Sequence, residues 1–231
     1  METKKYKLTD ETINVYGRTL YRIEALRDFG DVKKGDKGGF VEKEENLSQN
    51  GNCWVYHNAV VYDDAEVYDN AKVYDDAVVY DNAKIYGNAV VCDNAMVYNN
   101  AKVYDNVMVC DDAIVCDNAE VSDYSWVYGN ATVSHNTKIY GSVKIYDKAV
   151  VSGNARVRDN AWVWGNAEVY DYAEVCGNAE VYNNAKIFGD AIVGGDANIF
   201  GNAKVYGEAM VYGEADVCDN AEVCGDMEVY D

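Results

Sequence analysis

Residues 61–90 read VYDDAEVYDNAKVYDDAVVYDNAKIYGNAV, which is five copies of one six-residue unit. Each unit begins with Val or Ile, continues with Tyr, two turn-forming residues and Ala, and ends with a variable residue. Stepping by six from Val55 to Val229 gives thirty positions, of which twenty-five are Val and five are Ile. Ala stands four residues after these positions in twenty-four of twenty-nine cases. A period that never slips predicts a repeat protein built from stacked units.

Each hexad is expected to form a short strand followed by a corner. Val and Ile favour a pleated strand and would point inward, whereas Asp, Asn and Gly tolerate the unusual backbone that a corner requires. Ala fits the corner because little space is left there. One hexad cannot bury its own apolar side, so hexads must wind into coils that hydrogen-bond to one another. The predicted fold is therefore an all-β solenoid.

The pattern resembles that of the left-handed parallel β-helix, or hexapeptide-repeat, superfamily. The resemblance covers residues 51–231 and implies a left-handed triangular prism with three hexads, or eighteen residues, in each coil. Thirty hexads then make ten coils, and about 4.8 Å between neighbouring strands gives a prism about 48 Å long. Family members usually carry a small or acidic residue after the aliphatic one, but sixteen of the thirty positions here are Tyr. We interpret these tyrosines as outward ladders that stack from coil to coil.

Residues 1–50, which we name the leader, form the first of two predicted domains, and residues 51–231 form the β-solenoid. Alternating apolar residues and glycine-rich turns predict that the leader is a hairpin and a small β cap over the first coil. Its segment 28–40, DFGDVKKGDKGGF, resembles leaders that precede such repeats in phage and mobile-element proteins of unassigned function. In the last coil Met227 replaces Ala, and we expect it to plug the open end of the prism.

The chain has 40 acidic and 20 basic side chains, and its net charge of −20 arises in residues 51–231, because the leader holds ten of each kind. Direct binding to nucleic acid or to an anionic membrane is therefore not expected. The sequence has neither a secretory signal nor an apolar run long enough to span a bilayer. Seven cysteines without CxxC spacing favour thiols in a reducing compartment over a disulfide framework. These features predict a cytoplasmic protein, in the host cytoplasm if the chain is phage-encoded.

Because side chains alternate along a strand and eighteen residues make one coil, the outward side chains can be sorted onto three faces of the prism. The second face alternates Lys, Arg and Glu, as expected of a solvated surface. The third face is mixed and carries the tryptophans Trp54, Trp126, Trp162 and Trp164. The first face is almost uncharged over six coils, with Val60, Val78, Met96, Ile114, Thr132 and Val150 beside Tyr62, Tyr80 and Tyr98.

An apolar strip of several hundred Å² on the first face predicts a contact surface. We expect self-association through it, as a dimer or trimer. The alternatives are that the leader folds back over the strip, that a host or viral protein covers it, or that it forms a groove for a small ligand.

Hexapeptide-repeat enzymes include acyltransferases, which typically use a histidine and a loop that leaves the prism. Here the period leaves no room for such a loop between Val55 and Val229. The two histidines, His57 and His135, are thirteen hexads apart and should lie on different corners. A three-histidine zinc site would need a ligand that the sequence lacks. We therefore expect no catalytic residue and no cofactor, and keep acyl transfer by a trimer as the enzymatic alternative.

Two further groups of residues are candidate sites. Cys92 and Cys110 should be stacked neighbours, but no nearby base would activate a thiol nucleophile. Aspartates crowd one corner in successive coils, where a hard cation such as Ca²⁺ would relieve their repulsion, although solvated turns explain them equally well. These are Asp75, Asp76, Asp93, Asp111 and Asp112.

The function inferred from the sequence is that of a non-enzymatic acidic β-solenoid that acts as a binding protein. Its charge per length is comparable to that of duplex DNA, so the specific hypothesis is a phage-encoded inhibitor of a host nucleic-acid-handling or defence protein. The alternatives are an acyltransferase-type trimer and a structural rod or scaffold.

Overall fold

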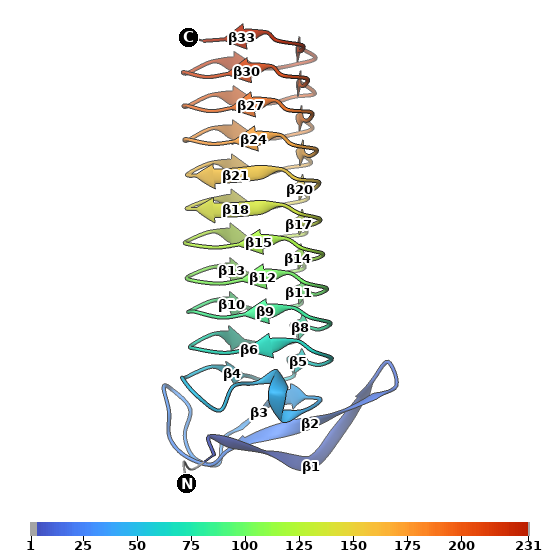
Figure 1. Cartoon of the computed structure of the whole chain (residues 1–231), viewed down its shortest axis with the longest axis vertical. Coiled ribbons are helices and arrows are strands. Elements are labelled where there is room, and N and C mark those ends of the chain that lie inside the picture. The colour runs from blue at the N-terminus through green and yellow to red at the C-terminus, as the bar shows by residue number, and fades with distance from the viewer. Residues whose placement is uncertain (1–3, 231) are drawn as a thin grey trace.

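The computed structural model describes residues 4–230 as a tall triangular solenoid that stands on the leader (Figure 1). In the leader, β1 (Tyr6–Val15), β2 (Arg18–Ala25) and β3 (Lys37–Val41) are followed by a short 3-10 helix, η1 (Glu44–Asn46). The solenoid contains the thirty short strands β4 to β33, which form three parallel sheets. The predicted all-β solenoid is confirmed.

The first face continues the sheet of the leader, in the order β1-β2-β3-β5 and then every third strand to β32. The pairs β1–β2 and β2–β3 are antiparallel, whereas β3 pairs in parallel with β5. The solenoid strands of this face are β5 (Val60–Val61), β8 (Val78–Val79), β11 (Met96–Val97), β14 (Ile114–Val115), β17 (Thr132–Val133), β20 (Val150–Val151), β23 (Glu168–Val169), β26 (Lys186–Ile187), β29 (Lys204–Val205) and β32 (Glu222–Val223).

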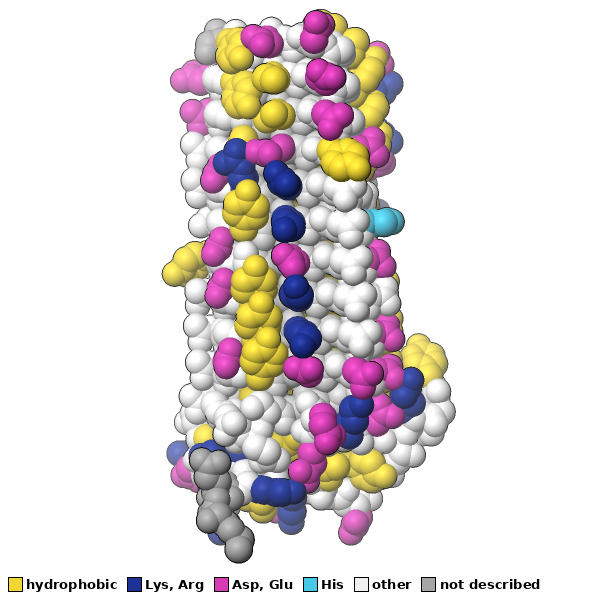
Figure 2. All heavy atoms as spheres, in the orientation of Figure 1, with side chains coloured by type: hydrophobic (Ala, Val, Ile, Leu, Met, Phe, Trp, Pro, Cys, Tyr) yellow, Lys and Arg dark blue, Asp and Glu magenta, His cyan; other side chains and the backbone are white. Residues whose placement is uncertain are grey.

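The second face is a ten-stranded sheet that presents the alternating charges. Figure 2 shows them as a column of basic and acidic side chains beside a column of apolar ones. The strands are β6 (Glu66–Val67), β9 (Lys84–Ile85), β12 (Lys102–Val103), β15 (Glu120–Val121), β18 (Lys138–Gly141), β21 (Arg156–Asp159), β24 (Glu174–Val175), β27 (Ile192–Val193), β30 (Met210–Val211) and β33 (Glu228–Val229).

The third face is the other ten-stranded sheet. Its strands are β4 (Trp54–Val55), β7 (Lys72–Val73), β10 (Val90–Val91), β13 (Met108–Val109), β16 (Trp126–Val127), β19 (Lys144–Ile145), β22 (Trp162–Val163), β25 (Glu180–Val181), β28 (Asn198–Ile199) and β31 (Asp216–Val217). Because partners in each sheet are eighteen residues apart, as Val91 and Val109 are, the predicted closure of one coil by three hexads is confirmed.

The corners follow from the residues that the period places there. Asp, Asn and His adopt a positive φ at the third position of the hexad, for example 58° at Asp93, and Gly takes this position in other coils. These are the residue types that tolerate the left-handed region best. At Gly87, with φ of +68°, an added Cβ would lie 2.7 Å from the backbone nitrogen of Asp105. Asp69 and Asp105 hold the same corner position in the adjacent coils with φ of 58° and 59°, so the corner requires a residue that tolerates the left-handed backbone rather than glycine itself.

The core is one continuous cluster that runs from Tyr6 in the leader to Val223 near the last coil. It consists almost entirely of the inward Val or Ile and the corner Ala of each hexad, which are fully buried through most of the solenoid. Met227, which we expected to plug the open end, is instead 46% exposed, so that prediction is wrong. The side chain lies on the last coil, where no further coil packs against it.

The predicted aromatic ladders are confirmed. Rings at equivalent positions of successive coils stack with centroids about 5 Å apart, as in Tyr68–Tyr86 at 4.8 Å with planes 4° apart. The separation matches the distance between neighbouring strands, because the ladder takes its spacing from the sheet. The outward tyrosines therefore contribute stacking energy along the axis.

The leader closes the lower end of the prism. Its Phe40 and Val41 pair in parallel with Val60 and Val61, and Leu47 forms a parallel bridge to Val67. The parallel pairing of the solenoid thus begins at Phe40, within the leader. Among residues 4–230, no helix is long and apolar enough to cross a membrane.

Trp54 corrects the assignment of the third face. We placed it with the outward tryptophans, but it is only 1% exposed. The rings of Tyr6 and Phe29 pack edge-on against it at 6.1 and 5.3 Å. The reason is that the leader covers the first coil of this face, and the hexad period contains no information about that cover.

Candidate functional site

The β1–β2 hairpin packs against the lower end of the first face. Leu20 and Phe40 of the leader form a buried cluster with Val60 and Tyr62. In Figure 1 the tip of the hairpin reaches outward and upward beside the first coils. The leader therefore covers the lowest coil of the apolar strip, which was one of the alternatives left open. It covers the second coil in part, because Val78 and Tyr80 pack partly against this cluster.

A cleft of about 590 Å³ lies between the hairpin tip and the first face. On the hairpin side, Tyr16 is 94% exposed and holds a positive φ of 49° at the turn. Burial raises the pKa of Tyr62 to about 12, so its phenol stays protonated at neutral pH. The cleft is lined by Asn14, Val15, Tyr16, Asn58, Val60, Tyr62, Asp76, Val78, Tyr80 and Met96.

His57 and Asp75 form a hydrogen-bonded pair at the corner between the third and the first face. His57 Nδ1 lies 2.8 Å from Asp75 Oδ1, although the two residues are eighteen apart in the chain. The Asp75 backbone nitrogen also lies 3.4 Å from Nδ1, and the tautomer with the proton on Nδ1, which donates to the carboxylate, leaves Nε2 as an acceptor. The His57 side chain is 60% exposed. This arrangement is the one required of a general base oriented by a carboxylate.

Neither His57 nor Asp75 lines the cleft, but the residue that follows each of them does. Asn58 and Asp76, which directly follow His57 and Asp75, both line the cleft. They are joined to each other, because Asn58 Nδ2 donates to Asp76 Oδ1 at 3.3 Å. A molecule in the cleft would therefore lie next to the corner that holds His57.

Arg22 of the leader fixes the backbone of this corner. Its Nη1 donates to the carbonyl oxygens of Gly38, at 2.7 Å, and of His57, at 3.1 Å. The guanidinium carbon lies 4.1 Å from the centroid of the Phe40 ring. Glu11 accepts a hydrogen bond from Arg22 Nε at 2.6 Å. The leader and the first coil thus position His57 together.

His135 lies on another corner, after the first face, as its spacing predicted. Its Nδ1 lies 3.1 Å from Ser134 Oγ and 3.9 Å from Asp117 Oδ2, so it makes no close contact with a carboxylate. It faces no part of the leader cleft. Only His57 combines a carboxylate partner with an adjacent cleft.

Sequence reasoning missed Asp75 and Arg22 as partners of His57. Asp75 could have been found, because closure of the coil by eighteen residues places it directly beside His57. Instead we assigned Asp75 to the aspartate corner. Arg22 could not have been found, since nothing in the leader's sequence fixes where the hairpin packs.

The remaining aspartates of that corner accept hydrogen bonds from the next coil or the preceding one. Asp93 Oδ2 accepts from the backbone nitrogen of Asp111 at 3.3 Å, and Asp111 Oδ2 from that of Gly129 at 2.9 Å. Asp112 accepts from Asn94 Nδ2 at 3.1 Å. The five carboxylates thus have separate partners, and a Ca²⁺ site at this corner stays an untested prediction.

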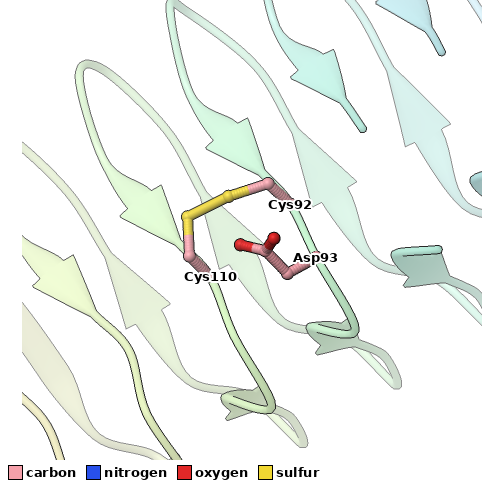
Figure 3. Close-up of side chains that lie close together, drawn as sticks. All are labelled: Cys92, Asp93 and Cys110. Carbon is pink, nitrogen blue, oxygen red and sulfur yellow. A yellow bond between two sulfur atoms is a disulfide. The ribbon is translucent and has the colours of Figure 1, made fainter. Parts of the chain in front are cut away.

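The cysteines differ from expectation at one place. Cys92 and Cys110 are stacked neighbours, as predicted, but the structure joins them in a disulfide (Figure 3). Their Cα atoms are 4.7 Å apart because they occupy the same position of successive coils. The other five cysteines are free.

The outer parts of the first and third faces remain accessible. Met96, Ile114 and Val150 are half-buried on the first face, with Tyr98 stacked on Tyr80 at 4.9 Å. On the third face, Trp126 is exposed and Lys144 Nζ lies 4.2 Å from the Trp162 ring. Trp164 belongs to an aromatic ladder between Tyr146 and Tyr182.

Three comparisons with known proteins bear on this arrangement. Residues 126–141 match the YdcK β-solenoid repeat family. A segment of 47 residues is 45% identical to the uncharacterized acetyltransferase YdcK of Escherichia coli K12. The segment makes up 20% of this chain and 14% of that protein. The fold is similar to that of the UDP-N-acetylglucosamine acyltransferase of Francisella novicida, with a TM-score of 0.58 and 16% identity over 65% of this chain and 62% of that chain. The chain has the left-handed β-helix fold. This bears out the fold that the superfamily resemblance implies, whereas the likeness of segment 28–40 to phage leaders stays a prediction.

The UDP-N-acetylglucosamine acyltransferase of Campylobacter jejuni is a weaker structural neighbour, with a TM-score of 0.41 and 16% identity over 65% of this chain and 68% of that chain. The expectation of a non-enzymatic binding protein that inhibits a host protein is wrong, because the curated relative and the structural neighbour at a TM-score of 0.58 carry acetyltransferase and acyltransferase names. The sequence-based expectation considered each histidine without its neighbour in the next coil, and so did not include the contact between His57 and Asp75. The solenoid has no loop that leaves the prism, but the leader forms one side of a cleft, which the hexad period does not reveal.

Proposed function

We propose that this chain is an acyltransferase in which His57, oriented by Asp75, is the general base and the leader cleft holds the reacting groups. The observation that carries the proposal is the 2.8 Å contact between His57 Nδ1 and Asp75 Oδ1, whose sequence neighbours Asn58 and Asp76 line that cleft. The names of the curated relative and of the structural neighbour support the reaction class. The chain covers less than two thirds of either protein, so the acceptor is not carried over from them.

In the proposed reaction an acyl thioester is the donor and a hydroxyl or amine is the acceptor. His57 Nε2 removes the acceptor's proton as its oxygen or nitrogen attacks the thioester carbonyl carbon. The new bond to carbon forms, the carbon–sulfur bond breaks, and the departing thiolate takes the proton back from the imidazolium. Asp75 stabilises the imidazolium while it exists, because its carboxylate is hydrogen-bonded to Nδ1.

The rest of the chain has defined parts in this proposal. The leader, residues 1–50, supplies one wall of the cleft, and the solenoid domain, residues 51–231, supplies the pair of catalytic side chains. We propose that the chain forms a homo-oligomer, with a trimer as the preferred state. It would assemble through the first face at Met96, Ile114 and Val150. We propose a reducing, cytoplasmic location, which the five free cysteines favour and in which Cys92 and Cys110, bonded in the structure, would stand as thiols.

The test is acetyl transfer from acetyl-CoA to a panel of amine and sugar-nucleotide acceptors, with His57→Ala and His135→Ala as matched variants. We expect His57→Ala to lower kcat by about 10² to 10⁴-fold and His135→Ala to leave it unchanged. Equal activity of His57→Ala and the unchanged protein would refute the assignment. So would a failure of the unchanged protein to bind acetyl-CoA in calorimetry.

A further inference from the structure

Cys92 and Cys110 interrupt an aromatic ladder. They occupy the outward position that follows the third face, between the stacked pair Tyr56–Tyr74 on one side and Tyr128–Tyr146 on the other. Of the seven cysteines, these are the two that stand at equivalent positions of successive coils. Coil stacking therefore holds two thiol-bearing side chains side by side, with Cα atoms 4.7 Å apart.

Asp93 places a carboxylate next to both sulfur atoms. It follows Cys92 at the corner, where its φ of 58° turns the side chain toward the next coil. Figure 3 shows the carboxylate directed at the Cys92–Cys110 bridge. The two Sγ atoms and a carboxylate oxygen of Asp93 all lie within 4.8 Å of one another. Within residues 4–230 this is the one group of three such donors gathered so closely.

The surroundings of the three side chains suit a cation with an open coordination position. Asp93 Oδ2 accepts a hydrogen bond from the backbone nitrogen of Asp111, which leaves Oδ1 as the carboxylate oxygen available as a ligand. Cys110 is buried while Asp93 is exposed, which leaves the group open on one side. A hollow of about 290 Å³ adjoins Cys110 and is lined also by Met108, Asp111, Trp126 and Tyr128.

We propose that the reduced chain binds Zn²⁺ through the sulfur atoms of Cys92 and Cys110 and the carboxylate of Asp93, with a fourth position left for water or another ligand. Two thiolates select a thiophilic ion over Ca²⁺ or Mg²⁺. Tetrahedral Zn–S bonds of about 2.3 Å set the sulfur atoms about 3.8 Å apart, a separation that two stacked side chains can reach by rotation about χ1. On binding, both thiols lose their protons to solvent, so two protons are released for each ion.

The disulfide is the oxidised alternative of the same site. A small-molecule disulfide such as oxidised glutathione would convert the two thiols to the Cys92–Cys110 bond and leave as two thiol molecules. The bonded sulfur atoms are no longer thiolates, so the ion would dissociate. Metal binding and the disulfide therefore exclude each other at this corner. The site lies one coil beyond Asp75, but its binding is measured without an acyl donor and does not depend on the proposed acyl transfer.

The test uses the full chain, reduced with a phosphine and kept free of oxygen, and Co²⁺ alone as the spectroscopic probe. We expect tetrahedral cobalt–thiolate absorption bands that saturate at one ion per chain and disappear when Zn²⁺ is added. Cys92→Ser and Cys110→Ser should abolish the bands, and Asp93→Asn should weaken Co²⁺ binding by at least about tenfold. Cys116→Ser and Cys218→Ser are the matched controls and should keep the spectrum of the unchanged protein.

The oxidised chain without substitutions provides a second test, which does not depend on whether a variant folds. It should bind no Co²⁺ and regain binding after reduction. Absence of thiolate bands in the reduced chain would overturn the proposal, as would bands that persist in the oxidised chain or in the Cys92→Ser and Cys110→Ser variants. An unchanged affinity in Asp93→Asn would overturn the ligand set.

Discussion

Arg22 in the leader donates a hydrogen bond to the backbone carbonyl of His57, 35 residues away, at 3.1 Å. The same guanidinium binds Gly38 and stacks on Phe40. The position of His57 is thus set by a part of the chain that contains no hexad. This contact links the leader to the chemistry that we propose for the first coil.

We expect Arg22→Ala to lower kcat for acetyl transfer by about tenfold to a hundredfold, because a small displacement of a catalytic group is costly. KM should change less, since Arg22 does not line the cleft. Arg22→Lys should not restore the rate, because an ammonium cannot reproduce the planar contacts with two carbonyls and a ring. Steady-state kinetics measure both quantities. Arg156→Ala, on the exposed second face, is the control, and an equal loss in that variant would contradict the positioning role.

Tyr86→Ala should destabilise the chain more than Tyr140→Ala. Tyr86 stacks on Tyr68 and on Tyr104, each with centroids 4.8 Å apart. Tyr140 occupies the equivalent position of a later coil between Ser122 and Arg158, which offer no ring to stack on. Two ring pairs correspond to about 1 to 3 kcal/mol of unfolding free energy. Urea unfolding followed by circular dichroism measures the difference, and equal losses would show that the ladders contribute nothing beyond burial.

Asp31 should make the stability of the chain depend on acid pH. Its carboxylate accepts hydrogen bonds from Lys72 Nζ and from the Tyr56 hydroxyl, both at 2.9 Å. The hydrogen bond from Lys72 is the main reason that the pKa of Asp31 lies below its usual value of about 3.9. Because the folded pKa is depressed, the stabilisation is present above the unfolded pKa and is lost as the pH falls through the folded pKa.

We therefore expect Asp31→Asn to cost no more than about 1 kcal/mol at pH 7, because the carboxylate is more than half exposed. The difference from the unchanged protein should shrink as the pH falls below the usual carboxyl pKa and the Asp31 carboxylate takes up its proton. Denaturant unfolding at several pH values measures it, with the exposed Glu208→Gln as control. A difference that stays constant down to pH 2 would rule out this linkage.

The sequence predicts those features of the structure that follow from the six-residue period. Val91 and Val109 point inward and pair as stacked residues because eighteen residues close a coil, so fold, register and ladders were predictable. Handedness came from the family resemblance alone. The buried position of Trp54 was not predictable, since it depends on where the leader packs.

The site was predictable only in part. The contact between His57 and Asp75 follows from the coil length and could have been inferred. The cleft could not, because it forms between the repeats and a hairpin whose direction no local pattern specifies. The stacking of Cys92 and Cys110 was predicted, whereas their bond depends on redox conditions that the residue pattern does not contain.

Self-association should depend on the first face above the hairpin. Ile114→Glu and Val150→Glu each place a charge in the half-buried strip, which should convert a dimer or trimer to monomer because an unpaired charge is costly to bury. Multi-angle light scattering measures the mass of each variant. Lys138→Glu, on the exposed second face, should keep the assembly. If the unchanged protein is monomeric at all concentrations, that result would contradict the proposed oligomer.

The most direct test of the account is a crystal structure of the chain with a bound, non-hydrolysable thioether analogue of acetyl-CoA. We predict that the analogue's acyl carbon lies in the cleft between the β1–β2 hairpin and the first face, within reach of His57 Nε2. An analogue bound at another corner, with the leader cleft left to solvent, would contradict the assignment of His57 and Asp75 as the reacting pair.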